Sequence, residues 1–309
     1  MSNKKKVLIL LACRNGESWI REQLDTILAQ QDVDISVLIQ DDKSSDNTPA
    51  VIAEYAASNP ERIVIYLNDV GTGSAGANFR KLITRADLSD VDYVALADQD
   101  DIWHCDKMSG AISALQSTGA LGYSATVDAF WPDGKRRVLD QSPKVRTLDF
   151  IFEGAGQGCT FVLPASVMSD VQLFCRRHAD ALASFHFHDW LIYILVRTSG
   201  GLWHFDPAPA MQYRQHENND MGARGGLAGL RRRVALIRQG WYIKQLLIAL
   251  NIFRLAGGTD ARSTVLEAVL QSAPSWSRRF KLAKLSFNHG RRRFSDRCVL
   301  SIFALLGWF

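Results

Sequence analysis

Four short apolar runs divide the first hundred residues, and each run ends in a polar cluster. The runs cover residues 7–12, 35–39, 63–67 and 93–97. Helical patterns fill the intervals between them, at about 19–30, 48–57 and 78–85. Strands that alternate with helices in this way predict βαβ units and a mainly parallel, doubly wound sheet. Because such sheets bind ligands beyond the carboxyl ends of their strands, the polar clusters are the first candidates for a functional site.

The fourth run leads directly into Asp98-Gln99-Asp100-Asp101. Three carboxylates at the end of a buried strand are costly unless a cation neutralises them. We expect Mg²⁺ or Mn²⁺, and Mg²⁺ favours one or two carboxylates plus substrate phosphates over an all-protein cage. The cluster therefore predicts a divalent metal and a phosphorylated ligand. An acidic turn that caps a helix starting near Trp103 is the alternative.

The 309 residues fall into two zones of opposite charge. Residues 1–220 carry 20 Lys and Arg against 29 Asp and Glu, a balance of −9. Residues 221–309 carry 16 against 3, a balance of +13. This split predicts two functional zones and a polyanionic partner for the basic one.

Cysteine usage and the N-terminal residues indicate the compartment. Five cysteines are scattered along the chain without a CxxC pair, which predicts reduced thiols and neither a disulfide framework nor a zinc site. Lysines precede the run 7–12, as in a signal peptide, but the run is short and ends in Arg14-Asn15 without a small-residue cleavage site. We therefore expect a cytoplasmic protein whose first strand is this run.

Five motifs follow one another between residues 7 and 222. They are Cys13-Arg14-Asn15-Gly16-Glu17, Asp41-Asp42-Lys43-Ser44-Ser45-Asp46-Asn47-Thr48, Asp98-Gln99-Asp100-Asp101-Ile102-Trp103, His188-Asp189-Trp190 and Tyr213-Arg214-Gln215-His216. Together they resemble the family-2 glycosyltransferases, and within them the bacterial rhamnosyltransferase-like group. Each motif is weak alone, but five in the expected order are a strong signal. Lys43 stands where glycine is usual and Arg14 where an aromatic is usual, and both touch the nucleotide pocket.

The resemblance implies a fold, a reaction and its partners. It implies a GT-A-type catalytic domain over residues 1–222, with a doubly wound sheet flanked by helices, and leaves 223–309 as a basic, helical, membrane-proximal region. The enzyme would transfer a sugar with inversion from a nucleotide-diphosphate donor, with dTDP-L-rhamnose favoured. The acceptor would be a polyprenyl-linked glycan in bacterial surface polysaccharide synthesis, such as O-antigen.

The resemblance also assigns roles to residues at the predicted strand ends. Asp100 would bind the metal directly, and Asp98 and His216 would be further ligands, with Asp98 also near the ribose. Arg214 would contact the diphosphate by bidentate hydrogen bonds. The remaining donor-binding residues would be Cys13, Arg14, Asn15, Asp41, Asp42, Asn68, Gly71, Asn78, Gln99, Asp101 and Trp103.

Asp189 is the candidate general base. Because a metal-bound diphosphate leaves without further help, one carboxylate suffices to take the proton of the acceptor hydroxyl. His188 and Trp190 flank Asp189 and would orient the acceptor or the base. The alternative is that Asp189 caps a helix starting at Leu191, and both roles can hold together.

Three basic clusters mark the region 223–309, among interleaved aromatic residues. They are Arg231-Arg232-Arg233, Arg278-Arg279 with Lys281 and Lys284, and Arg291-Arg292-Arg293. No run reaches the roughly 18 apolar residues that span a bilayer. The pattern predicts two or three long helices of which an amphipathic face lies on an anionic leaflet, so that the protein is peripherally attached to the inner face of the membrane. A helical subdomain packed on the catalytic core with a solvated basic face is the alternative.

Two other function classes predict different features. A sugar-phosphate nucleotidyltransferase would carry a long glycine-rich phosphate loop after the first strand, where this chain has Cys13-Arg14-Asn15-Gly16. A non-catalytic nucleic-acid-binding protein would explain the basic end and predicts salt-sensitive binding to DNA or RNA. It would not explain carboxylates at successive strand ends, so we expect no nucleic-acid partner.

Overall fold

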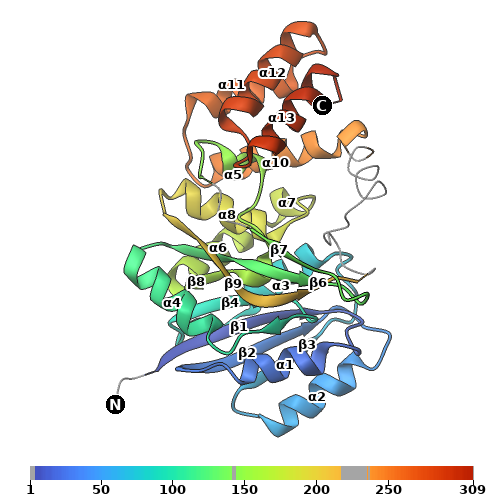
Figure 1. Ribbon diagram of the computed structural model, residues 1–309, viewed down its shortest axis with the longest axis vertical. Helices are drawn as coiled ribbons and strands as arrows, with labels where there is room; N and C mark the ends of the chain where they lie inside the picture. Colours follow the sequence, from blue (N-terminus) through green and yellow to red (C-terminus); the bar gives the residue numbers. More distant parts are fainter. Residues whose placement is uncertain (1–3, 141–143, 217–234, 236, 309) are drawn as a thin grey trace.

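The structure, a computed structural model, describes residues 4–140, 144–216, 235 and 237–308, and a mixed sheet forms its centre (Figure 1). The described strands follow the order β3-β2-β1-β4-β8-β6-β9-β5, and β7 pairs with β6. Their bounds are β1 Lys5–Cys13, β2 Val33–Asp41, β3 Ile63–Leu67, β4 Tyr93–Ala97, β5 Ile102–Trp103, β6 Gly122–Phe130, β7 Arg136–Leu139, β8 Val162–Pro164 and β9 Trp203–Arg214.

The first four strands confirm the predicted parallel half of the sheet. β1 pairs in parallel with β2 and with β4, and β2 pairs in parallel with β3. The connecting helices are α1 Ile20–Leu28, α2 Thr48–Ser58 and α3 Ala75–Arg85. Cys13 lies opposite Asp41, and Asp41 opposite Leu67. The polar residues that follow these strands therefore emerge at one edge of the sheet.

The second half of the sheet is mixed. β8 is antiparallel to β4 and β6, β7 is antiparallel to β6, and β5 is antiparallel to β9, whereas β6 and β9 are parallel. β8 begins only at Val162, because Gly158–Thr160 forms a 3-10 turn before it. The helical segment after β8 breaks at His178 into α6 Ala165–Arg177 and α7 Ala179–Leu182.

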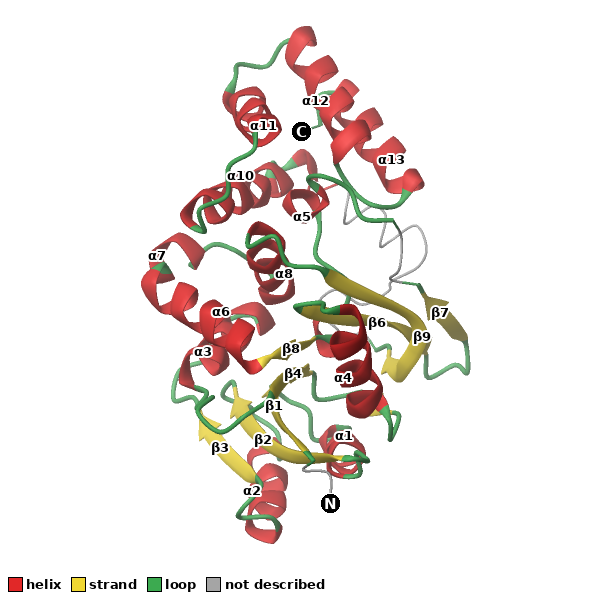
Figure 2. Cartoon of the chain, turned by 90° about the vertical axis from the view of Figure 1, so that its left-hand side faces the viewer, coloured by secondary structure: helices red, strands yellow, loops and turns green. Residues whose placement is uncertain are grey.

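Helices cover both faces of the sheet (Figures 1 and 2). Alternate residues of β1 separate two buried clusters, with Leu10 in one and Ile9 in the other. The Ile9 cluster takes in α1, α2 and α4 Lys107–Thr118. The Leu10 cluster takes in α3, α5 Asp149–Phe152, α6 and α8 His188–Thr198. β1, β2 and β4 are mostly buried on both faces, which explains their uninterrupted apolar runs, whereas the edge strand β3 is largely exposed.

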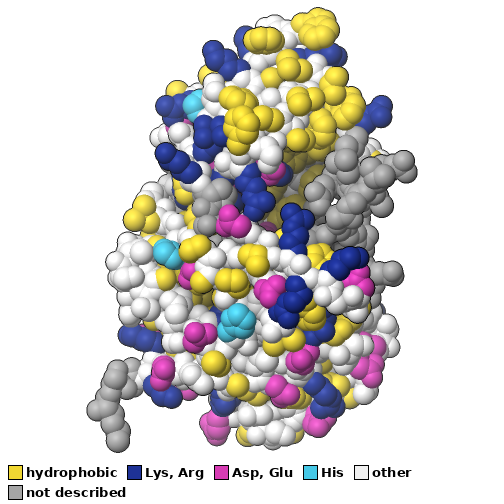
Figure 3. All heavy atoms as spheres, viewed as in Figure 1, with side chains coloured by type: hydrophobic (Ala, Val, Ile, Leu, Met, Phe, Trp, Pro, Cys, Tyr) yellow, Lys and Arg dark blue, Asp and Glu magenta, His cyan; other side chains and the backbone are white. Residues whose placement is uncertain are grey.

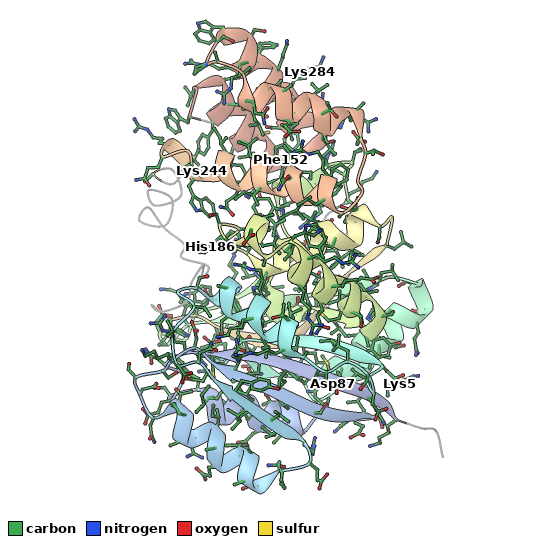
Figure 4. The ribbon with its side chains drawn as sticks, turned by 180° about the vertical axis from the view of Figure 1, so that it is seen from behind. Lys5, Asp87, Phe152, His186, Lys244 and Lys284 are labelled. Atoms are coloured by element: carbon green, nitrogen blue, oxygen red, sulfur yellow. The ribbon has the colours of Figure 1, made fainter. Side chains whose placement is uncertain are left out.

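Within the described residues, four C-terminal helices stack at the end of the molecule away from the N-terminus (Figure 2). They are α10 Trp241–Leu255, α11 Ala261–Gln271, α12 Trp276–His289 and α13 Phe294–Leu305, in place of the two or three long helices predicted. Leu246 and Leu250 of α10 belong to the same buried cluster as Leu10. Phe152 of α5 lies at the junction (Figure 4). The predicted boundary at 222/223 lies outside the described residues, but the two regions share one core.

The prediction that the basic clusters lie on a membrane-facing surface is wrong for Arg292 of the third cluster. Arg292 is 7% exposed, and its guanidinium lies 3.3 Å from the Asp149 carboxylate. Arg291 pairs with Asp296 at 3.6 Å. These acceptors offset the cost of burying a guanidinium, and Asp149 is too distant in sequence to be foreseen. Arg231-Arg232-Arg233 lies outside the described residues.

Two further features of the C-terminal region bear on membrane contact. Tyr242, one of the aromatic residues interleaved with the basic clusters, packs into the shared core: it is 4% exposed, and its hydroxyl donates to the Phe152 carbonyl at 2.7 Å. Within the ranges that the structure describes, every helix is too short or too polar to cross a bilayer.

Candidate active site

Gln99 joins the loops that follow β1 and β4. Its Oε1 accepts the backbone N–H of Arg14 at 2.7 Å, and its Nε2 donates to the Arg14 carbonyl at 3.0 Å. Gly16 allows this approach, because a Cβ there would overlap the Gln99 side chain. Gln99 and Arg14, both predicted to bind the donor, therefore fix the backbone of the loop after β1.

A second set of contacts joins the loop after β1 to the loop after β2. Asn15 donates its N–H to Ser44 Oγ at 2.8 Å, and Asn15 Oδ1 accepts the N–H of Ser45 at 2.7 Å. The φ angles of Asn15 and Lys43 are 51° and 60°, in the left-handed region. Glycine adopts this conformation at the lowest cost, which explains why glycine is usual where this chain has Lys43.

Asp42 is the centre of a buried polar network between β2 and the loop after β3. Its carboxylate accepts hydrogen bonds from Asn68 Nδ2 at 3.0 Å, from the Thr72 N–H at 2.7 Å and from the Thr72 hydroxyl at 2.8 Å. A Cβ at Gly71 would lie 3.5 Å from the Asp42 carbonyl oxygen. Asn68 Oδ1 is buried without a hydrogen-bond partner among the described residues, so it has an acceptor to offer a ligand.

Asp41 and Asn78 are as buried as Asp42, at 2% and 3% exposure. Asp41 accepts the N–H of Ser44 at 2.9 Å, and the Cys13 thiol lies 3.7 Å from Asp41 Oδ1. Burial, and then the charge of Asp41, raise the pKa of Cys13 well above its usual range. Asn78 binds the side chain of Gln40, with Gln40 Nε2 donating to Asn78 Oδ1 at 2.7 Å. These buried contacts hold the ends of β1 and β2 and the start of α3 in place.

Asp100 and His216, two of the predicted metal ligands, are in direct contact. His216 Nε2 lies 2.6 Å from Asp100 Oδ2, and the imidazole stacks on Trp19 with ring centroids 4.0 Å apart. Arg214 Nε donates to the Asp100 carbonyl at 2.9 Å, and Arg214 Nη2 pairs with Glu22 at 2.5 Å. The last strand of the sheet thus brings residues 214 and 216 to the acidic turn after β4.

Asp98 turns toward another group, formed with Asp101 and Cys159. Carboxylate oxygens of Asp98 and Asp101 and the Cys159 sulfur all lie within 4.8 Å of one another. Burial raises the pKa of Asp98, and the charges of Asp100 and Asp189 add to this shift. Burial and the charges of Asp100 and Asp98 also raise the pKa of Asp101. Repulsion of this kind favours a cation at this point.

Lys107 is a buried cation next to this group, at 3% exposure. Its Nζ donates to the Cys159 carbonyl at 2.7 Å and lies 3.2 Å from the centroid of the Trp103 ring. Burial lowers the pKa of Lys107 to about 7, although nearby Cys159 and Asp101 oppose that shift.

Helix α4 begins at Lys107 after Asp106, so the alternative that the acidic turn caps a helix near Trp103 is wrong.

Asp189 lies in the first turn of α8 and is partly exposed. Its Oδ1 accepts the N–H of Trp190 at 2.7 Å, and burial raises its pKa to about 6. The helix begins at His188, before the predicted Leu191, so Asp189 is not the N-cap residue. That position is Phe187, which makes no side-chain cap. Asp189 is thus a carboxylate with a raised pKa, and its negative charge helps to raise the pKa of Asp98.

The loop 154–159 packs closely against the start of α8. A Cβ at Gly158 would lie 2.7 Å from His188 Nε2 and 3.2 Å from the Cβ of Asp189. The His188 ring stacks on Phe79 at 3.9 Å, and its Nε2 has no hydrogen-bond partner among the described residues. Burial lowers the pKa of His188 to about 3, so this imidazole is neutral at physiological pH. The glycines of this loop allow the close packing.

Two predicted site residues lie in the core. Trp190 and Trp103 are each 3% exposed, and Trp190 Nε1 donates to the Phe150 carbonyl at 2.7 Å. Large aromatic side chains are buried for their apolar area, so these two support their neighbours Asp189 and Asp101 from behind. The structure places the other predicted residues at or beyond the carboxyl ends of β1, β2, β3 and β4, in α3 and α8, or at the end of β9.

Three residues at the site could not be assigned from the sequence. Thr72 and Cys159 lie far along the chain from the predicted residues that they contact, and Lys107 donates to the carbonyl of Cys159, so these contacts arise only through the fold. A weak signal existed for Lys107, which shares its helix face with Met108, Ala111 and Leu115, all buried. For Cys159 the signal was the preceding glycine-rich run.

Known proteins resemble this chain in sequence and in structure. It is 40% identical over 236 residues to the "dTDP-rhamnosyl transferase RfbG" of Shigella flexneri, which covers 76% of this chain and 82% of that protein. It is 31% identical over 109 residues to the Escherichia coli "UDP-Glc:alpha-D-GlcNAc-diphosphoundecaprenol beta-1,3-glucosyltransferase WfgD", which covers 35% of this chain and 40% of that protein.

The fold resembles S. aureus TarS residues 1–349, solved in complex with UDP-GlcNAc. The TM-score is 0.55 at 12% identity, and the match covers 98% of this chain and 90% of that one. This likeness confirms the GT-A type of fold that the motifs predict. Residues 8–183 match the family described as Glycosyl transferase family 2. Since that match covers more than half of the chain, and the chain covers most of RfbG at 40% identity, this chain belongs to glycosyl transferase family 2.

Proposed function

We propose that this chain transfers L-rhamnose from dTDP-L-rhamnose, with inversion, onto a lipid-linked glycan in bacterial surface polysaccharide synthesis. The main support for this reaction is the position of Asp189. It is a partly exposed carboxylate with a raised pKa, and it lies close enough to the acidic turn after β4 for its charge to raise the pKa of Asp98. The 40% identity to the dTDP-rhamnosyl transferase RfbG supports the donor.

In the proposed reaction, the acceptor hydroxyl oxygen attacks the anomeric carbon on the face opposite the diphosphate. A new carbon–oxygen bond forms, the bond from the anomeric carbon to the diphosphate oxygen breaks, and dTDP leaves with that electron pair. The hydroxyl proton passes to the Asp189 carboxylate. With a pKa of about 6, Asp189 is mostly ionised at neutral pH and remains basic enough to accept the proton.

The residues at the end of β4 fit a divalent metal, for which we propose Mg²⁺ or Mn²⁺. Asp101 Oδ2 is buried without a hydrogen-bond partner among the described residues, and the ligand atoms of Asp98, Asp101 and Cys159 converge. We propose Asp100 as the direct ligand, with Asp98 and His216 as further ligands. Such an ion would stabilise the negative charge of the leaving diphosphate.

The loops after β1, β2 and β3 would hold the nucleotide. We propose that Asp41, Asp42 and Asn68 bind the base and ribose, because Asn68 Oδ1 is buried and has no hydrogen-bond partner among the described residues. Cys13, Arg14, Asn15, Gly71, Asn78 and Gln99 would shape the pocket around them. Arg214, held between Glu22 and the Asp100 carbonyl, would place positive charge beside the diphosphate.

We propose a polyprenyl-linked acceptor at the inner face of the membrane. The name of WfgD describes a diphosphoundecaprenol acceptor, and this chain offers an exposed apolar face on its C-terminal helices. On α12, Trp276 and Phe280 are 75% and 71% exposed, and Lys281 and Lys284 are exposed beside them. We call these four residues the α12 face.

The α12 face combines the two features that bind an anionic leaflet. Aromatic side chains insert among lipid headgroups, and each basic residue near the surface contributes about 1 kcal/mol. Helix α12 carries no Asp or Glu that would repel the leaflet. Figure 3 shows apolar and basic side chains gathered at the end of the molecule that the C-terminal helices form, and Figure 4 shows Lys284 at that same end.

Two other classes of function are less well supported than this proposal. A sugar-phosphate nucleotidyltransferase is not favoured, since the chain belongs to glycosyl transferase family 2. Nucleic-acid binding through the basic end is not favoured either, since Arg292 of that region is bound internally to Asp149. We propose that neither DNA nor RNA is a partner.

A donor panel tests the proposal. Purified protein is mixed with dTDP-, UDP- and GDP-sugars and a GlcNAc-diphosphate acceptor on a short lipid chain, here called the short-chain acceptor. Release of nucleoside diphosphate is followed with Mg²⁺, Mn²⁺ or EDTA. We expect dTDP-L-rhamnose to react fastest, and only with a metal. A faster UDP- or GDP-sugar would refute the donor, and full activity in excess EDTA would refute the metal.

A variant tests the proposed metal ligand separately. Asp100→Ala should abolish turnover and weaken donor binding while the melting temperature stays close to that of the wild type. Asp128→Ala serves as a matched control, because this carboxylate is paired with Arg136 on the β6–β7 hairpin. Equal activity in the two variants would remove Asp100 from the site.

A further inference from the structure

The C-terminal helices hold the segment 149–154 through buried polar contacts. Arg292 lies in the turn between α12 and α13 and is 7% exposed. Its backbone N–H donates to Glu153 Oε1 at 2.6 Å, its Nη2 donates to the Gly154 carbonyl at 2.8 Å, and its Nη1 lies 3.3 Å from Asp149 Oδ2. A planar guanidinium with several acceptors fixes their relative positions more strictly than a point charge would.

The same segment is bound from the other side by α8. Asp149 is fully buried and accepts hydrogen bonds from the Tyr193 hydroxyl at 2.7 Å and from Arg197 Nη1 at 2.9 Å. Tyr242 of α10 adds a bond to the Phe152 carbonyl at 2.7 Å. Segment 149–154 therefore links the C-terminal helices to α8.

Segment 149–158 also contacts the first turn of α8, which carries Asp189. Trp190 Nε1 donates to the Phe150 carbonyl at 2.7 Å. A Cβ at Gly154 would lie 3.4 Å from the Cα of Trp190, and one at Gly158 would lie 3.2 Å from the Cβ of Asp189. With contacts this close, a displacement of the segment has to displace Asp189 or open a gap beside it.

We propose that Arg292 is a positioning residue for Asp189, and that the C-terminal helices thereby complete the catalytic site as well as carrying the α12 face. The inference rests on the proposed role of Asp189 as the base. Misplacing a reacting group by about 1 Å can cost on the order of 10²-fold in rate. Arg292 contacts none of the residues proposed to bind the donor. Its loss should therefore slow transfer and leave nucleotide affinity unchanged.

The experiment compares Arg292→Met and Arg292→Lys with the control Arg278→Met. Arg278 belongs to the same helical region, but its Nε donates to the Val269 carbonyl at 3.1 Å and supports only the contact of α12 with α11. For each variant we would measure kcat and KM with dTDP-L-rhamnose and the short-chain acceptor, dTDP affinity by calorimetry, and Tm. The assay temperature stays well below the lowest Tm.

We expect Arg292→Met to lower kcat roughly 10- to 100-fold with dTDP affinity within about twofold of wild type. Arg292→Lys should recover part of the rate, because lysine restores the positive charge but not the planar guanidinium that binds several acceptors at once. Arg278→Met should lower Tm and keep kcat. Wild-type kcat in Arg292→Met, or an equal loss in Arg278→Met, would overturn the proposal. If Arg292→Met does not fold, full kcat in Arg292→Lys overturns it.

The proposed function and this inference fail in different ways. Absence of transferase activity in the wild type would refute the function, and wild-type activity in Asp189→Asn would refute the base. A slow Asp189→Asn variant together with a fully active Arg292→Met variant would refute the positioning role alone.

Discussion

The acidic edge of the sheet and the basic C-terminal helices place their charges in opposite ways. At the edge, Asp98 and Asp101 converge, and burial, together with repulsion from Asp100, raises the pKa of both. In the helices the basic side chains separate, so that Arg292 turns inward while Lys281 and Lys284 face solvent. The first region concentrates charge for a ligand, and the second divides its charge between its own fold and its surface.

Three consecutive arginines show how local this division is. Arg292 is buried against Asp149, Arg291 pairs with Asp296, and Arg293 is exposed and donates to the Asp140 carbonyl. A basic run in a sequence therefore does not define a basic surface. The buried acceptors decide which of its members remain available to a partner.

The largest expected effect separates the two regions by chemistry. Asp189→Asn keeps the size of the side chain and its contact with the Trp190 N–H but cannot take a proton. We predict a loss of turnover of about 10²-fold or more, with dTDP affinity unchanged. Steady-state rates and calorimetry measure the two quantities. Wild-type rates would reduce Asp189 to a structural residue of the helix start.

A second prediction concerns the α12 face. Replacing Lys281 and Lys284 with Gln removes two charges, worth about 2 kcal/mol or roughly 30-fold in affinity for anionic vesicles. Turnover of the short-chain acceptor in detergent should not change. Lys4→Gln with Lys5→Gln is the control, because Lys5 lies at the opposite end of the molecule (Figure 4). Sedimentation with vesicles of varied anionic content gives the affinities, and equal binding by both pairs would refute the face.

A third prediction follows from the raised pKa of Asp189. As a base it works only when ionised, so kcat/KM for the acceptor should rise about tenfold per pH unit up to a pH near 6 and then level off. His188, with a pKa of about 3, stays neutral over this range, and the nearby Asp98, whose pKa is raised to about 7, is largely protonated below that pH. A pH–rate profile that is flat from pH 5 to 7 would contradict this prediction.

The smallest effect is expected from packing at the start of α8. Gly158→Ala would place a methyl group 2.7 Å from His188 Nε2 and 3.2 Å from the Asp189 Cβ, so the helix start must shift. We predict a loss in kcat of up to about tenfold. Gly110→Ala in α4 is the matched control, because a Cβ there meets nothing within 4 Å. Equal kcat in the two variants would show that Asp189 tolerates the displacement.

The sequence predicted the parallel half of the fold closely. The runs 63–67 and 93–97 coincide with β3 and β4. β4 is buried on both faces, as its uninterrupted apolar run predicts, whereas β3 lies at the edge of the sheet with Val64, Tyr66 and Leu67 exposed. β6 and β7 were not predicted. β7 is exposed, and β6 pairs with β9, which follows some eighty residues later in the sequence. Sequence order alone does not reveal such pairings.

The site divides in the same way. Motifs at strand ends predicted Asp41 and Asp100, because parallel strands end at one edge whatever their partners, whereas Asp189, which lies on a helix, was predicted from the family resemblance. Lys107 and Arg292 became visible only in the fold, since each is defined by acceptors far away in the sequence, such as the Cys159 carbonyl and Asp149.

One paired measurement tests most directly whether the sheet edge performs the chemistry and the C-terminal helices reach the membrane. Asp189→Asn and the Lys281→Gln, Lys284→Gln pair are assayed together for transfer to the short-chain acceptor and for binding to anionic vesicles. We predict that Asp189→Asn loses transfer and keeps vesicle binding, and that the lysine pair loses vesicle binding and keeps transfer. Loss of vesicle binding in Asp189→Asn, or of transfer in the lysine pair, would contradict the division.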